Sequence, residues 1–217
     1  MPIELKEDLM PGIRLAVWKI TESEHFFDRR LRLSPQGLSE KEKISHSSKR
    51  LQFMASRLLM QELLSENHSK RVLKTGFGKL VVPGSEVHIS ISHSGIYAAA
   101  AISNRNLGID IQVPDARLLH LSKKFIGSAE AENLQKEKNL SPLDFYHLVW
   151  GAKESMFKAY EKGGLDFIGH LKVQPFEAKK TGDWGETTAS LQKSKERKRY
   201  SIHFNRGRHF YLVVASE

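Results

Sequence analysis

The chain has 217 residues, 40% of them hydrophobic, and a formal net charge of +9. It contains no cysteine, which excludes disulfides, thiolate metal sites and cysteine nucleophiles. No apolar run approaches the roughly 20 residues of a membrane-spanning helix, and the N-terminus lacks a basic segment followed by a long apolar one. We therefore expect a cytoplasmic globular protein that does not act at membranes and whose positive charge favours anionic partners.

The two halves of the chain are predicted to share a plan of strand, helical region and strand cluster. In chain order, the apolar patterns predict a strand at 14–20, helices over 38–68, strands at 87–92, 97–103 and 108–113, helices over 117–136 and 141–162, and final strands at 169–176, 187–192, 199–205 and 209–215. Ser141 and Pro142 are typical of a helix start, and Gly163 is typical of a helix end. We expect two similar lobes that meet near the strand at 108–113.

That central strand carries one acid and one amide among apolar residues. Asp110 and Gln112 are two positions apart, so both side chains should point to the same side of the strand. The apolar neighbours Ile109 and Ile111 favour a buried carboxylate over a simple turn or edge aspartate. Because a buried carboxylate needs a partner, this strand is a candidate for a functional site.

On the predicted long helix, Trp150, Glu154 and Lys158 are spaced by four residues and share one face, with Lys153 beside them. A Glu–Lys pair at this spacing is often only a solvent-exposed ion pair. A tryptophan is costly to expose, however, so its place on this face indicates a half-buried cleft. Glu154 and Asp110 are then the acids expected to share a site. Two carboxylates and an amide oxygen fit Mg²⁺, which is held by oxygen ligands together with substrate phosphates.

Residues 90–95 (SISHSG) place Ser92, His93 and Ser94 in the predicted turn between two strands. These side chains could hold a phosphate, or they could satisfy backbone groups of the turn. A Ser-His-Asp nucleophile is not favoured, because the sequence has no GxSxG elbow. HExxH, Walker A and GxGxxG motifs are also absent. The basic run at 193–199 is interpreted as a solvated loop or strand edge.

Five ordered segments resemble the motifs of the 4′-phosphopantetheinyl transferases, specifically the larger two-lobed type. They are GFGK (76–79), ISHSG (91–95), GID (108–110), FIGSAE (125–130) and WGAKESMFKAYEKGGL (150–165). The last segment is the most specific, while Leu80 stands where the family usually has proline. The resemblance implies an α+β fold of two similar α/β lobes in a pseudo-twofold arrangement, each with a small antiparallel sheet packed on a long helix. It divides the chain into residues 1–105 and 106–217, with the active site in the cleft between the lobes.

The resemblance also implies an activity. Members of the family transfer the 4′-phosphopantetheine arm of coenzyme A (CoA) to a serine of an acyl or peptidyl carrier protein and release 3′,5′-ADP, with Mg²⁺ as cofactor. The expected partners are therefore CoA and an acidic carrier protein, and not nucleic acid. A monomer is expected because one chain supplies both lobes. The net charge of +9 suits both anionic partners.

Carried over by motif, the resemblance assigns roles to individual residues. Asp110, Glu154 and Gln112 would face the metal, and Lys158 would contact the CoA phosphates and stabilise charge in the transition state. Glu130 is the candidate to deprotonate the carrier serine, although a metal-bound water could do this instead. His93 and a helix arginine, Arg57 or Arg50, would hold the 3′-phosphate of CoA. The other residues expected to bind CoA are Lys79, Ser92 and Lys153.

Gln112 is the clearest departure from the family, which commonly has a second acid at this position. An amide is neutral and offers only its oxygen to a metal. We therefore expect retained activity with a raised metal requirement. Three other hypotheses stay open: a CoA-binding but catalytically impaired homologue, a basic nucleic-acid-binding protein, and a plain interaction protein. The second lacks any RRM, KH or zinc signature.

Overall fold

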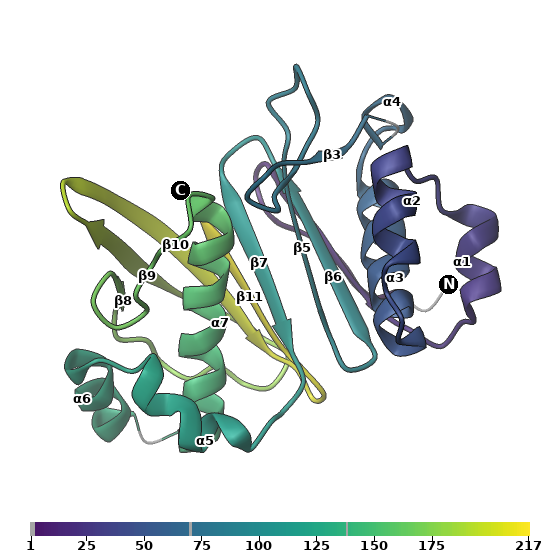
Figure 1. Ribbon diagram of the computed structural model, residues 1–217. Helices are drawn as coiled ribbons and strands as arrows, with labels where there is room; N and C mark the ends of the chain where they lie inside the picture. Colours follow the sequence, from purple (N-terminus) through teal and green to yellow (C-terminus); the bar gives the residue numbers. More distant parts are fainter. Residues whose placement is uncertain (1–2, 70, 138) are drawn as a thin grey trace. The chain divides into compact units, whose positions relative to one another are not determined.

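The computed structural model describes residues 3–69, 71–137 and 139–217, and the chain divides into two compact units, 1–107 and 108–217 (Figure 1). Each unit combines an antiparallel sheet with a long helix, which confirms the predicted α+β class. The pseudo-twofold relation between the lobes and the cleft between them stay predictions. None of the helices in the described residues has the length and apolar character needed to cross a membrane.

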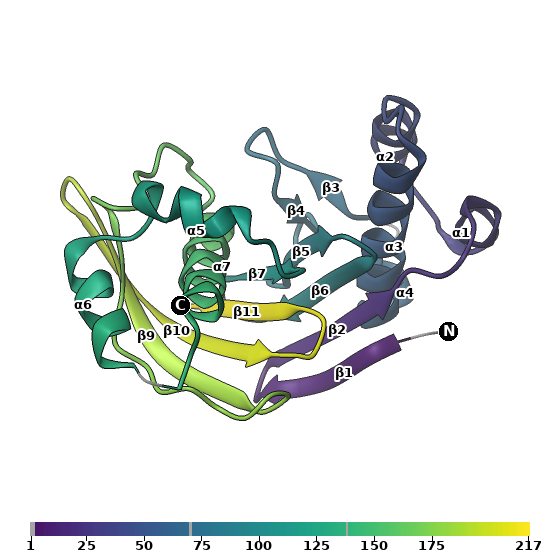
Figure 2. The same cartoon turned by 90° about the horizontal axis from the view of Figure 1, so that it is seen from below.

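Unit 1 is a six-stranded sheet with the order β1-β2-β6-β5-β4-β3 and helices on one face (Figure 2). Its elements are β1 (Ile3–Met10), β2 (Ile13–Lys19), α1 (Glu24–Arg30), α2 (Pro35–Glu42), α3 (Ser47–Leu63), α4 (Glu66–Ser69), β3 (Leu73–Lys74), β4 (Leu80–Val81), β5 (His88–Ser94) and β6 (Tyr97–Ser103). The sequence patterns predicted β2, β5, β6 and the helical region, but not β1 or α1.

The core of unit 1 lies between α3 and the sheet. Met54 and Leu58 of α3 pack in one cluster with Ala98 and Ala100 of β6. Because side chains alternate along a strand, these two alanines lie on one face of β6, where their small size lets the helix approach closely. Each fully buried leucine or methionine contributes roughly 1.5–3 kcal/mol through the hydrophobic effect.

Unit 2 is a five-stranded sheet with the order β7-β11-β10-β9-β8, against which one long helix packs. Its elements are β7 (Leu107–Gln112), α5 (Arg117–Leu121), a 3₁₀ turn (Ser122–Lys124), α6 (Ser128–Lys136), α7 (Pro142–Tyr160), β8 (Leu171–Val173), β9 (Trp184–Lys193), β10 (Glu196–Arg206) and β11 (Tyr211–Ser216). The core side of α7 shows helical spacing: Phe145, Val149, Ala152, Met156 and Ala159 are all buried.

The ends of α7 bear out the predicted start but not the predicted end. The Ser141 hydroxyl accepts a hydrogen bond from the backbone N–H of Asp144, and Pro142 follows in the first turn. The helix ends at Tyr160, three residues before the expected glycine stop. Glu161 takes up the left-handed conformation itself, with φ of 68°.

Candidate active site

The close approach of β7 to α7 positions the central acid. A Cβ atom on Gly108 would lie 1.9 Å from the carbonyl oxygen of Ser155, so no larger residue fits at this point of the strand. Two residues further along β7, Asp110 is only 7% exposed. The glycine of the GID motif therefore lets the acid two residues later lie against the long helix.

Asp110 is joined to the helix by Lys158. The Lys158 ammonium group donates to Asp110 Oδ1 at 2.7 Å and to the carbonyl of Ile109 at 2.8 Å. The carboxylate is buried while the lysine side chain is 27% exposed, so the ion pair borders the solvent. This contact is made inside unit 2.

Glu154 lies one helical turn before Lys158, and the charge of Asp110 acts on it. Burial raises the pKa of Glu154, and the negative charge of Asp110 raises it further, against the opposing effect of Lys158. The two negative charges repel each other, and a divalent cation bound beside them would reduce this repulsion. Within the described residues, no group of three or more histidine, cysteine, aspartate or glutamate side chains could hold a metal. A pair of carboxylates is a donor set that can hold Mg²⁺ together with phosphates and water.

Gln112 points to the same side of β7 as Asp110, as predicted, and its amide is engaged at both ends. Its nitrogen donates to Asp110 Oδ2 at 2.6 Å. Its oxygen lies 3.0 Å from Nδ1 of His147, a fully buried residue of α7. The nitrogen, and not the oxygen expected to bind metal, therefore faces Asp110.

His147 was missed at the level of sequence. The signal that could have found it is its spacing, because His147 precedes Glu154 by two helical turns and Lys158 by three, on the same face of α7. A histidine among apolar residues of a long helix is easily taken for an ordinary buried side chain.

Lys153 and Glu130 form a separate, fully buried cluster. The Lys153 ammonium group, 0% exposed, donates to Glu130 Oε2 at 2.8 Å and to the carbonyls of Phe125 (2.6 Å) and Phe167 (2.8 Å). These three bonds use all three of its N–H donors. Burial lowers the pKa of Lys153, against the opposing charge of Glu130. The geometry therefore favours a structural role for Lys153 over the nucleotide contact expected from the motif.

Glu130 is also occupied on both oxygens. Besides Lys153, it accepts the backbone N–H of Gly127 at 2.8 Å and that of Val173 at 3.0 Å. The carboxylate thus caps α6 and ties it to β8, and Glu130 is only 3% exposed. This environment favours a structural role over the expected role as base for the carrier serine.

Beside Glu154, the same face of α7 borders an apolar pocket of about 580 Å³. Its lining comprises Leu121, Lys124, Trp150, Glu154, Phe157, Leu165, Asp166 and Phe167. Trp150 is half-buried and packs against Phe125 and Phe167, with ring centroids 5.0 and 5.3 Å away. The predicted half-buried hollow next to Trp150 is therefore present.

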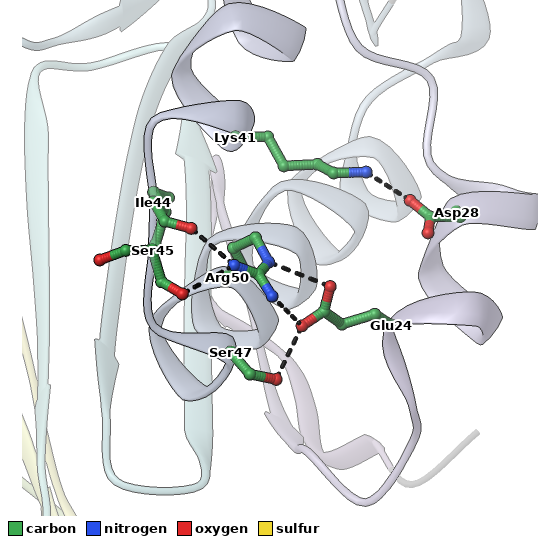
Figure 3. Close-up of polar contacts among 7 residues, drawn as sticks. All are labelled: Glu24, Asp28, Lys41, Ile44, Ser45, Ser47 and Arg50. Carbon is green, nitrogen blue, oxygen red and sulfur yellow. Dashed lines mark hydrogen bonds and ion pairs between the residues drawn. The ribbon is translucent and has the colours of Figure 1, made fainter.

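The two candidate arginines of unit 1 are engaged with glutamates. Arg50 Nε and Nη2 each lie 3.0 Å from the carboxylate of Glu24, and Arg50 Nη1 donates to the carbonyls of Ile44 and Ser45 (Figure 3). These contacts hold the start of α3 to α1. Arg57 lies 3.1 Å from Glu40 of α2 and stacks 3.6 Å over the ring of Phe53. Burial lowers the pKa of Arg57, against the opposing charge of Glu40.

The remaining candidates of unit 1 lie on β5 and just before β4. β5 runs through Ser94, and the turn consists of Gly95 and Ile96. Ser92 and His93 are therefore in the strand, not in the turn as expected, and they point to opposite faces: Ser92 is buried and His93 is exposed. Lys79 donates to Asn106 Oδ1 at 2.9 Å.

Comparison with known proteins supports the resemblance for the part of the chain that carries this site. Residues 106–212 match the family described as the 4′-phosphopantetheinyl transferase superfamily. These residues, just under half of the chain, are similar to that superfamily, and every candidate residue of unit 2 lies inside the match.

Individual relatives are similar over shorter stretches. The 4′-phosphopantetheinyl transferase Sfp of Bacillus subtilis (strain 168) is 31% identical over 88 residues, which is 40% of this chain and 39% of that protein. The 4′-phosphopantetheinyl transferase gsp of Aneurinibacillus migulanus is 30% identical over 112 residues, which is 52% of this chain and 47% of that protein. The chain thus spans less than half the length of these curated relatives.

Proposed function

We propose that this protein transfers 4′-phosphopantetheine from CoA to a serine of an acyl or peptidyl carrier protein, in a Mg²⁺-dependent reaction that releases 3′,5′-ADP. The observation that carries the proposal is the trio of Asp110, Glu154 and Lys158. The Lys158 ammonium group pairs with Asp110, and the charges of both residues act on Glu154, inside the region that matches the superfamily.

In the proposed reaction, the serine hydroxyl gives up its proton to solvent as its oxygen bonds to the phosphorus of the phosphopantetheine group. The bond from that phosphorus to the bridging oxygen of 3′,5′-ADP breaks, and its electron pair stays on the leaving phosphate. Bound Mg²⁺ would supply positive charge to the diphosphate, and Asp110 and Glu154 would hold it. Lys158 adds a second positive charge where negative charge develops on the leaving phosphate. Such transfers depend mostly on positioning and electrostatic stabilisation, which these three side chains provide.

The remaining expected roles rest on the motifs. Lys79, Ser92 and His93 are proposed to contact the CoA nucleotide. Arg50 and Arg57 are weaker candidates, because each is already paired with a glutamate. The net charge of +9 favours both CoA and an acidic carrier protein. A cytoplasmic, monomeric enzyme fits this proposal.

The direct test is to incubate the protein with CoA, Mg²⁺ and an apo carrier protein and to measure the intact mass of the carrier. We expect the carrier to gain the mass of one phosphopantetheine group, with 3′,5′-ADP released in equal amount. A carrier whose acceptor serine is replaced by alanine serves as the control without gain, and the Asp110→Asn variant serves as a control with a much slower gain. CoA binding with no gain on any acyl or peptidyl carrier would instead identify an impaired homologue.

A further inference from the structure

A chain of hydrogen bonds leads from the backbone beyond β7 to the carboxylate of Asp110. The backbone N–H of Asp115 donates to Nε2 of His147 at 3.0 Å. Nδ1 of His147 lies 3.0 Å from the oxygen of Gln112, and the Gln112 nitrogen donates to Asp110 Oδ2 at 2.6 Å. Four groups are thus connected in series.

The direction of this chain is fixed by its first member. A backbone N–H can only donate, so Nε2 of His147 must be the acceptor and carries no proton. A neutral imidazole then has its proton on Nδ1, where it must donate to the oxygen of Gln112. With its oxygen turned to His147, the amide has only its N–H groups to present to Asp110. The geometry therefore settles which end of the amide faces the carboxylate.

Packing keeps the imidazole in this orientation. His147 is 0% exposed, and its ring stacks on Tyr211 with centroids 4.2 Å apart and planes inclined by 6°. The Tyr211 hydroxyl donates to Asp144 at 2.6 Å, so the stacking partner is itself anchored. Rotation of the imidazole would break both of its hydrogen bonds inside the core, which is costly for buried polar groups.

We infer that His147 is a positioning residue, which holds Gln112 as a hydrogen-bond donor to Asp110 and thereby keeps the Gln112 oxygen away from the metal. The inference rests on the proposed function in taking Asp110 as a metal ligand. The Gln112 N–H groups orient the carboxylate that the proposed function takes as a metal ligand. A partner of this kind, one step behind the ligand, commonly tunes metal binding.

The tautomer of His147 tests the inference without any transferase assay. The nitrogen-15 resonances of His147, assigned by comparison with His147→Phe, are recorded before and after addition of Mg²⁺. We expect a proton on Nδ1 and none on Nε2 in both states. If the Gln112 oxygen turned to the metal, its NH₂ group would face Nδ1 and the proton would move to Nε2. A proton on Nε2, or on both nitrogens, in the Mg²⁺-loaded protein would overturn the inference.

A metal titration supplies the second test. Free Mn²⁺, which prefers oxygen ligands as Mg²⁺ does, is counted by electron paramagnetic resonance. We expect His147→Phe, which keeps a stacked ring but removes the donor, to raise the Mn²⁺ dissociation constant about tenfold. Tyr211→Phe is the matched control, because it keeps the stacking ring and should leave binding within about twofold.

The outcomes separate the two proposals. Equal Mn²⁺ binding by His147→Phe and the unaltered protein, or no saturable binding by the unaltered protein, would overturn the inference whatever the carrier assay gives. The Nδ1 tautomer together with weakened Mn²⁺ binding by His147→Phe would support it even if no carrier protein were modified. If His147→Phe does not fold, the tautomer of the unaltered protein decides, assigned through Gln112→Ala.

Discussion

The ammonium group of Lys158 lies 2.7 Å from Oδ1 of Asp110 and joins the long helix of unit 2 to the central strand. The pair brings together residues that are 48 positions apart in the sequence. It also balances one of the two carboxylates in a site where burial, and then the charge of Asp110, raise the pKa of Glu154. The two members of the pair therefore have opposite effects on cation binding, which makes their roles separable.

We predict that Asp110→Asn and Lys158→Met both lower phosphopantetheine transfer, by roughly a hundredfold, but change Mg²⁺ dependence in opposite directions. Asp110→Asn removes a negative charge, so more Mg²⁺ is needed. Lys158→Met removes a positive charge beside the carboxylates, so Mg²⁺ binds more tightly and less Mg²⁺ is needed. Transfer rates at a series of Mg²⁺ concentrations measure both effects. A rise in the Mg²⁺ requirement of Lys158→Met would contradict the assignment of Lys158 to the phosphates.

Gln112→Glu is predicted to keep the transferase active and to lower the Mg²⁺ concentration that gives half-maximal rate. The substitution adds a negative charge beside Asp110, which favours a divalent cation over water. A Mg²⁺ titration of both proteins with saturating CoA measures the difference. Gln112→Ala is the control, since it removes the amide without adding charge and should not lower the requirement. Identical Mg²⁺ curves for the glutamate variant and the unaltered protein would reject the prediction.

Gly108→Ala is predicted to destabilise the protein by about 3 kcal/mol, because the new methyl group meets backbone that cannot move away easily. The added Cβ would lie 1.9 Å from the Ser155 carbonyl oxygen. Gly76→Ala is the matched control, since no atom lies within 4 Å of a Cβ at that position. Denaturant unfolding of the two variants gives the free energies of unfolding. Similar values would show that β7 and α7 do not approach as closely as described.

Substitutions in the buried pair of Lys153 and Glu130 are predicted to have large and non-additive effects on the free energy of unfolding. Lys153→Met leaves the Glu130 carboxylate buried without its cation and should cost about 3–5 kcal/mol in the free energy of unfolding. The double variant Lys153→Met with Glu130→Gln should recover part of this loss, because the uncompensated charge is gone. A stable Lys153→Met protein that has lost CoA binding would instead restore the nucleotide contact expected from the motif.

The lowered pKa of Asp144 predicts that part of the protein's stability is lost at low pH. Burial acts to raise the pKa of Asp144, but hydrogen bonds from Tyr211 and Ser141 and the charge of Arg206 outweigh it and lower the pKa. Since the pKa is lower in the folded than in the unfolded state, the stabilisation is present above about pH 4 and is lost as pH falls through the folded-state pKa.

Asp144→Asn should therefore be less stable than the unaltered protein at pH 7, by about 1–3 kcal/mol, and should lose less stability between about pH 4 and pH 2. Unfolding by denaturant across this pH range measures both slopes. Parallel pH profiles for the two proteins would show that Asp144 does not contribute to the acid sensitivity.

The sequence by itself determined most of the secondary structure of unit 2 and which of the candidate side chains share a face of β7 or of α7. Spacing by four on a long apolar helix put Glu154 and Lys158 on one face, and alternation along a strand put Asp110 and Gln112 on one side. Both inferences depend only on the geometry of single elements. The presence of both helices and strands also follows from local patterns, because helical and alternating apolar spacing each report the element in which they occur. The α+β class itself was implied by the family resemblance.

Only the tertiary structure decided how the candidate side chains are used. Lys153 is one residue from Glu154, yet a helix turns by about 100° per residue, and Lys153 is directed into the core, where three acceptors from distant segments surround it. The partner of Gln112 lies 35 residues away on α7. Such contacts depend on how elements pack. The periodicity within one helix or strand does not show which distant positions packing brings together. Side-chain type therefore indicated the chemistry available, and packing selected which groups can take part.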